Sequence, residues 1–165
     1  MDDHGQDVET LGKLIAGIGT AMLTTAEPDG SLRSRPMATQ DARHFDGTLW
    51  FFTRDESPKV DEVKKDAHVN LAYSDPVHQT YVSVSGRATV VRDEAKAKEL
   101  WTPAMKAWFP KGLDAPDLAL LKVEVEKAEY WDTPPSAVVH LVGFVKATLT
   151  GKPYQPGDHA KVDLK

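Results

Sequence analysis

A short motif with hydroxyl and cationic groups follows a strand-like run at 48–53. It reads Ser57-Pro58-Lys59. Ser57 suits the N-cap of a helix and Pro58 its first position, so the first turn would present backbone N–H groups without helical acceptors. Together with the Lys59 ammonium they would form a site for a phosphate monoester. In the competing interpretation Ser57 only caps a helix, Lys59 is solvated, and the acidic pair at 61–62 suits the helix dipole without any ligand.

Two arginines precede this motif. Arg33 and Arg35 are separated by one residue, so their side chains lie on one face of a strand expected over 31–39. If that strand lies beside the strand that ends at Thr53, one guanidinium fork could reach the same phosphate. Exposed arginines without a ligand are the alternative.

Other residues that could do chemistry give weaker signals. The histidines lack the spacing of metal ligands, so no metal site is predicted. The chain has no cysteine, which excludes disulfides and thiolate chemistry and fits a cytoplasmic location. Four tryptophans offer flat apolar surface against which a tricyclic ring could pack, although most tryptophans are core residues: Trp50, Trp101, Trp108 and Trp131.

Length and composition limit the class of protein. A chain of 165 residues with 41% hydrophobic and 27% charged residues suits one soluble globular domain over 1–165, with a core at about 11–151. The formal charge is −5 and no basic cluster occurs, so nucleic acid is not an expected partner. No apolar run has the length of a membrane span, and the first residues are acidic and polar, so neither membrane insertion nor export is expected.

The pattern of apolar residues predicts short strands with a few inserted helices. Gly86 marks a bulge or a close backbone approach inside one strand. This arrangement favours a mainly β fold with peripheral helices, an antiparallel barrel, followed by a loose polar tail after Gly151. Strands are expected over 20–25, 31–39, 48–53, 69–73, 80–91 and 121–130, and helices over 8–18, 57–65, 94–101 and 136–150.

An ordered series of motifs resembles a known family. In sequence these are Arg35-Pro36-Met37, the run at 46–53, Ser57-Pro58-Lys59, and the runs at 81–86, 108–112 and 128–132. Their order over about 11–151 is similar to the general stress protein 26 group of the pyridoxamine 5′-phosphate oxidase-like, FMN-binding split-barrel superfamily.

The resemblance implies a homodimer of antiparallel split β-barrels with two FMN sites at the subunit interface. By the same resemblance, Trp131 approaches the flavin from the partner chain, and Trp101 and Trp108 are lesser candidates. The flavin would be lined by Arg35, Pro36 and Met37, its phosphate flanked by Phe52 and Thr53 and bound by Ser57 and Lys59.

The C-terminal end departs from the true pyridoxamine phosphate oxidases, because 151–158 lacks their arginine-rich substrate motif. The expected function is therefore an FMN-dependent oxidoreductase of unknown substrate, whose chemistry the flavin supplies. A flavin binder or stress-response protein without a dedicated substrate is the alternative. Binding of the deazaflavin F420 or of haem is a third possibility. The sequence argues against both, because it shows no extra basic cluster and no axial histidine.

Overall fold

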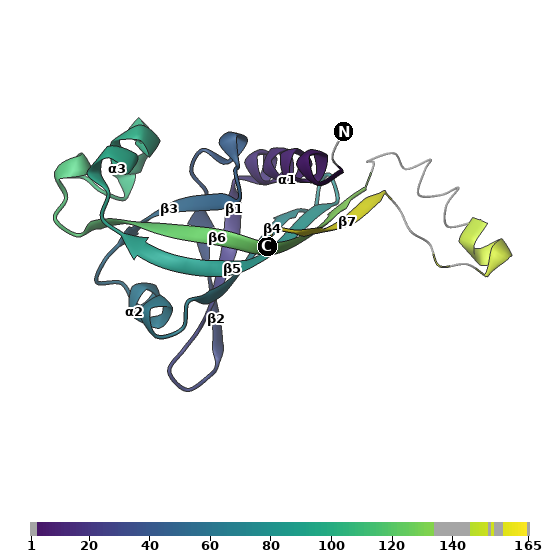
Figure 1. Cartoon of the computed structure of the whole chain (residues 1–165), viewed down its shortest axis with the longest axis horizontal. Helices are drawn as coiled ribbons and strands as arrows, with labels where there is room; N and C mark the ends of the chain where they lie inside the picture. The colour runs from purple at the N-terminus through teal and green to yellow at the C-terminus, as the bar shows by residue number, and fades with distance from the viewer. Residues whose placement is uncertain (1–2, 134–145, 152, 154–156, 165) are drawn as a thin grey trace.

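The computed structural model describes residues 3–133, 146–151, 153 and 157–164. From α1 to β6 its helices and strands follow the expected order along the chain, with short 3-10 turns between them (Figure 1). The helices are α1 (Asp3–Ile18), α2 (Pro58–Lys65) and α3 (Glu94–Leu100), and the strands are β1 (Thr20–Ala26), β2 (Leu32–Ala38), β3 (Thr48–Arg54), β4 (His68–Asp75), β5 (Thr80–Val91), β6 (Leu118–Asp132) and β7 (Asp158–Asp163).

The strands form one antiparallel sheet in the order β2-β1-β4-β5-β6-β3, and β7 pairs with the other end of β6. The sheet curls into a half-barrel, which makes β2 and β3 its two edges (Figure 1). Among the described residues, a single isolated bridge between Gln40 and Trp50 joins the segments beside these edges. The barrel is therefore split between two strands that are consecutive in the sequence, and the predicted antiparallel split-barrel fold is confirmed.

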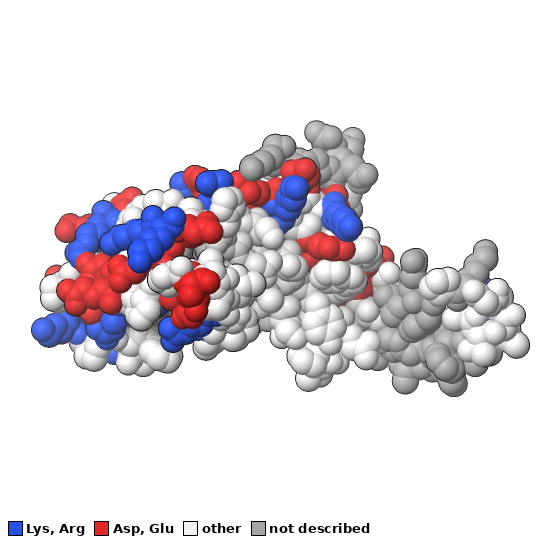
Figure 2. Space-filling view, turned by 90° about the horizontal axis from the view of Figure 1, so that it is seen from below, with Lys and Arg blue, Asp and Glu red and all other residues white. Residues whose placement is uncertain are grey.

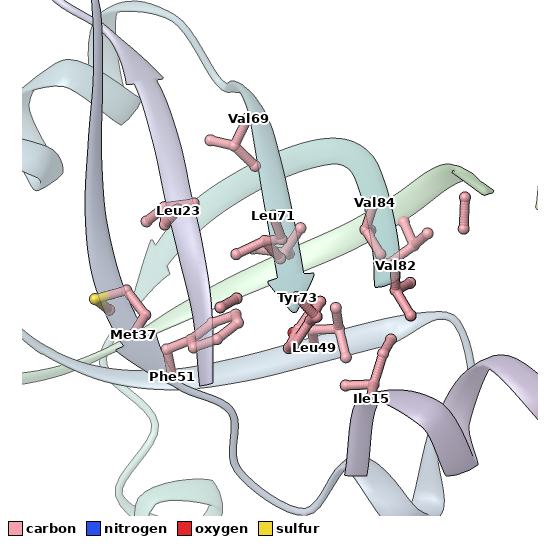
Figure 3. Close-up of a cluster of buried hydrophobic side chains, with 14 of the residues drawn as sticks. Ile15, Leu23, Met37, Leu49, Phe51, Val69, Leu71, Tyr73, Val82 and Val84 are labelled. Atoms are coloured by element: carbon pink, nitrogen blue, oxygen red, sulfur yellow. The ribbon is translucent and has the colours of Figure 1, made fainter. Parts of the chain in front are cut away.

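The concave face of the sheet holds the main hydrophobic core. Burial alternates along the strands, as a sheet with one solvated face requires. Leu11 and Ile15 of α1 are fully buried and close one end of this core. Figure 3 shows ten of its labelled side chains converging from α1 and five strands: Ile15, Leu23, Met37, Leu49, Phe51, Val69, Leu71, Tyr73, Val82 and Val84.

A second apolar cluster lies on the opposite face of β3 and β6. It is covered by α3 and by the two 3-10 turns Pro103–Ala107 and Gly112–Asp114. Phe52 packs edge-on against Trp101, with ring centroids 5.6 Å apart, and lies 6.3 Å from the Phe109 ring. This end of the sheet is thus covered on both faces.

Several expectations are confirmed or corrected. Gly86 lies at a register shift, where a Cβ atom would come within 2.3 Å of the Glu124 carbonyl oxygen, so the predicted bulge with close approach is confirmed. The expected helix over 136–150 falls mostly outside the described residues, but 146–150 is helical and ends at Gly151, whose φ is +67°.

The expectation of a loose tail after Gly151 is wrong for 158–163. These residues form β7, and Val162 is 3% exposed because it joins the core through its pairing with Ala128. Polar composition misled the prediction, since β7 has one solvated face and needs few apolar residues. Within the described part of the chain, no helix is long and apolar enough to cross a membrane.

Candidate functional site

The start of α2 has the geometry that the sequence predicts. Ser57 is the N-cap residue, with extended backbone (φ −78°, ψ 149°), and Pro58 is the first helical residue. The Ser57 hydroxyl accepts no hydrogen bond from the helix and lies 3.4 Å from the Thr53 hydroxyl. The backbone N–H of Lys59, at the second position, has no helical acceptor. The helix therefore begins with polar groups that its own cap leaves available.

Lys59 is half-buried next to these groups. Within the part of the chain that the structure describes, its ammonium makes no hydrogen bond or ion pair. Burial lowers the pKa of Lys59, and the positive charges of Arg35 and Arg33 lower it further, against an opposing effect of Glu62. An anion placed here would relieve both the burial of the cation and its repulsion by the arginines.

Arg35 lies close to Lys59 but is already engaged. Its guanidinium donates to Glu62 at 2.7 Å and to the Thr25 hydroxyl, and Thr25 donates to the same Glu62 oxygen at 2.5 Å. Glu62 is 6% exposed. Burial raises the pKa of Glu62, but the hydrogen bonds from Thr25 and Arg35 outweigh it and the net pKa is lowered. Glu62 is therefore a buried, ionised partner of Arg35.

The sequence let Arg33 or Arg35 reach α2 only if β2 lay beside β3, and the two strands do not pair. β2 pairs with β1 and not with β3, which pairs with β6 instead. The turn at 27–30 fixes β2 to β1 as a hairpin, so β3 finds its partner elsewhere in the sheet. Arg35 reaches the site because Glu62 extends from α2 and accepts a hydrogen bond from the Arg35 guanidinium.

Three predicted site residues point elsewhere within the chain. Thr53 faces α2 and is 3% exposed, whereas its neighbour Phe52 points into the second cluster on the opposite face. Met37 is buried in the main core, and Pro36 projects from the other side of β2 into solvent. The side chains that the structure brings together are thus those of Arg35, Thr53, Ser57 and Lys59.

Trp131 lies at the far end of the same sheet. Thr53 pairs with Ala119 at the start of β6, while Trp131 stands near the end of this 15-residue strand. The separation along the strand is roughly 40 Å at 3.3 Å per residue. Within one chain, Trp131 and the start of α2 do not form a common site.

The surroundings of Trp131 are aromatic and polar. Trp131 is 39% exposed and stacks on His159 of β7, with centroids 5.4 Å apart and planes inclined by 11°. Glu129 lies 2.6 Å from the Nε2 atom of His159 and fixes the imidazole in this stack. The pair forms a flat surface on the solvated face of the sheet. Trp101 packs against Phe52, and Trp108 is 70% exposed at the other end of the molecule.

Glu62 and Thr25 are the residues that sequence reasoning missed. Glu62 was assigned only to the helix dipole, and its burial corrects that interpretation. A signal was present, because Arg35 shares its strand face with the buried Met37 and an inward-facing arginine needs a carboxylate.

The sequence itself matches a protein-family model described as pyridoxamine 5′-phosphate oxidase like, over residues 6–155. The chain belongs to the pyridoxamine 5′-phosphate oxidase-like family. A curated member of similar sequence is protein bli-3 of Neurospora crassa, which is 28% identical over 157 residues, or 90% of this chain and 75% of that protein.

Solved structures of related proteins agree with this family. A protein described as general stress protein 26 from Jannaschia sp. CCS1 has a TM-score of 0.76 at 23% identity, over 98% of this chain and 99% of that one. The general stress FMN/FAD binding protein of Xanthomonas citri has a TM-score of 0.67 at 29% identity, over 77% of this chain and 89% of that one. The general stress protein 26 resemblance and the split-barrel fold are thereby confirmed.

Proposed function

We propose that this chain binds FMN, with the flavin phosphate at the start of α2, and that the bound flavin serves an oxidoreductase reaction. The observation that carries the proposal is Lys59, a half-buried cation without a hydrogen-bonding partner among the described residues, at the start of a helix with an uncapped hydroxyl. The flavin-binding description of the Xanthomonas citri relative supports a flavin as the ligand.

The residues at this site suit a phosphate monoester. The Lys59 ammonium supplies charge, the Ser57 hydroxyl can donate a hydrogen bond, and the backbone N–H of the first turn adds a dipole of favourable sign. Thr53, buried beside Ser57, holds that hydroxyl within the site. The flavin ring, when bound, would supply the electron or hydride chemistry. The protein would supply binding and orientation.

We propose further that the functional unit is a homodimer in which Trp131 of one chain meets the flavin held by the other. The proposal is supported by the position of Trp131, which lies too far from α2 of its own chain to contact a flavin bound there. In Figure 2, charged side chains crowd the left half of the molecule, where α2 and α3 lie, and another group lies along the upper part of the middle, whereas the lower part of the middle is largely uncharged. Part of the outward face of four adjacent strands is uncharged and includes the exposed Met22 and Tyr81, although Arg87 and His68 stand at one end of it. The uncharged residues are Met22, Thr24, Ser34, Pro36, Asn70, Ala72, Tyr81 and Ser83.

Substitution of Lys59 tests the phosphate site. Lys59→Ala removes a charge-assisted contact of about 1.5–3 kcal/mol, so the Kd for FMN should rise about 10- to 150-fold. The Kd for riboflavin, which lacks the phosphate, should not change. Lys64→Ala is the matched control, because Lys64 is an exposed lysine on the same helix. Equal losses of FMN and riboflavin binding would place the phosphate elsewhere.

Anaerobic reduction separates the oxidoreductase from a flavin binder without a substrate. The FMN-loaded protein is mixed with dithionite, with NADH or NADPH, and with pyridoxamine phosphate, and flavin absorbance is followed. We expect bleaching by dithionite and by a nicotinamide, and little by pyridoxamine phosphate, whose phosphate finds no arginine motif at the C-terminal end. Bleaching by dithionite alone would favour the binder, and rapid bleaching by pyridoxamine phosphate would contradict the substrate argument.

A further inference from the structure

A buried carboxylate lies within the cationic cluster that the proposed phosphate site uses. Glu62 is three residues after Lys59, so it stands one helical turn further along α2. One of its oxygens, Oε2, accepts from both Arg35 and Thr25. The Glu62 carboxylate therefore puts a negative charge of the protein itself into a cluster of cations that would otherwise suit the negative charge of a ligand phosphate.

The three cations of this cluster differ in how they are engaged. Lys59 has no hydrogen bond or ion pair within the described residues. Arg33 is about half exposed and lies 3.7 Å from Glu27, too far for a strong pair. Arg35 is 16% exposed and directs both terminal nitrogens at the Glu62–Thr25 pair. Arg35 is thus the cation whose availability to a phosphate depends on another side chain.

We infer that Glu62 is the resident counter-anion of the phosphate site: it occupies Arg35 through their hydrogen bond and thereby sets how tightly a phosphate monoester binds. The inference rests on the proposed function. A phosphate at Lys59 must share the Arg35 guanidinium with Glu62, and it meets the repulsion of that carboxylate. Glu62 is a positioning residue in this account, since it acts on the ligand through Arg35.

The placement of Glu62 argues against a purely structural ion pair. Apolar residues of similar volume often replace a buried ion pair without loss of stability, so stability alone does not require these charges. The neighbours of Glu62 on the buried side of α2 are Val60 and Val63, which show that this face accommodates apolar side chains. A carboxylate between them brings its negative charge against the two cations nearest the helix start.

The test compares Glu62→Gln with the unmodified full-length chain by titration with FMN, riboflavin and inorganic phosphate. Glutamine keeps the shape of the side chain but removes the charge, so Arg35 becomes available to the ligand. We expect the Kd for FMN to fall about 10-fold, because one more charge-assisted hydrogen bond then reaches the phosphate, with a parallel fall for inorganic phosphate and none for riboflavin. Asp61→Asn is the matched control, because Asp61 is an exposed carboxylate on the same helix without a contact to Arg35.

An unchanged or raised Kd for FMN in Glu62→Gln, or an equal change for riboflavin, would overturn the inference. If this variant fails to fold, the Arg35 Nε–H resonance of the unmodified protein decides. It should shift when FMN is added and stay in place with riboflavin, and no shift with FMN would overturn the inference. The Lys59→Ala variant separates the two proposals. If it loses affinity for FMN but not for riboflavin, the phosphate site is upheld even where Glu62→Gln overturns the role of Glu62. If it shows no such selective loss, both proposals are overturned.

Discussion

The two ends of the sheet differ in how complete they are. At the α2 end, side chains from β1, β2 and α2 meet in one buried network of Thr25, Arg35 and Glu62 beside the unengaged Lys59. At the other end, Trp131 and His159 stack on the solvated face, where Trp131 is 39% exposed. The first end is organised by the fold of one chain, and the second is the surface that the other chain completes in the proposed homodimer.

This difference teaches where each kind of recognition resides. In the proposed site, the charge of the phosphate would be recognised at a position that the fold organises in advance, because a buried cation must be held by neighbours that fix its geometry. The flat aromatic surface needs no such network, since Trp131 is held by strand pairing and by its stack on His159. Substitutions at the two ends should therefore affect the protein in different ways.

The largest expected effect is on the stability of the protein and comes from a substitution at the α2 end of the sheet. Arg35→Met leaves the Glu62 carboxylate buried without its cation, which should lower the free energy of unfolding by about 3–5 kcal/mol. Urea unfolding followed by tryptophan fluorescence measures this loss. Arg33→Ala, at the more exposed arginine of the same strand face, should change the free energy by less than about 1 kcal/mol. Similar losses for the two variants would mean that the Glu62 pair contributes little.

Much of this end could be read from local sequence. Ser57 and Pro58 specify the helix start through their own backbone preferences, and the alternation of Arg33 and Arg35 fixes their shared face. The pairing of β3 with β6 could not be predicted, because Phe51 and Phe52 suit burial on either face and the partner strand comes some 70 residues later. For Glu62 the sequence supplies half of the answer: an inward-facing Arg35 needs a carboxylate, but which one it meets depends on where β2 packs.

The segment at 158–163 shows a second limit, because here the local sequence contains no indication of the strand that forms. His159 and Lys161 gave no strand signal, since β7 is short and only its inward residues, Ala160 and Val162, are apolar. Its pairing with β6 supplies the register that places His159 against Trp131. The resemblance supplied Trp131 as a site residue, but nothing in the sequence indicated its distance from Lys59.

An intermediate effect should appear when the two ends are mutated in different chains. Lys59→Ala and Trp131→Ala each weaken FMN binding, the first selectively through the phosphate and the second by about 10-fold through lost ring stacking. If each site joins Lys59 of one chain to Trp131 of the other, a heterodimer of the two variants has one intact site and one doubly altered site. Differently tagged, co-purified heterodimers should bind one FMN per dimer with the Kd of the unmodified protein.

Two weakened sites, and none of full affinity, in the heterodimer would contradict the shared arrangement. The unmixed variants serve as controls, and both should bind without any site of full affinity. Size-exclusion chromatography with light scattering accompanies the titration. A stable monomer with full FMN affinity would also contradict the arrangement.

The smallest expected effect is the acid response of the buried carboxylate. Burial raises the pKa of Glu62, and the hydrogen bonds from Thr25 and Arg35 lower it by more, so the net change is the remainder of two opposed effects. Because the pKa is lower in the folded than in the unfolded chain, ionised Glu62 contributes stability above its unfolded value of 4.5. That contribution is lost as the pH falls through the folded pKa.

The unmodified protein should therefore have a higher free energy of unfolding in urea than Glu62→Gln at pH 6, and this difference should shrink toward the acid limit of folding. The other carboxylates with lowered pKa values, such as Asp66 and Asp75, are common to both proteins and cancel in the difference. A difference that stays constant with pH would show that Glu62 is not ionised against Arg35.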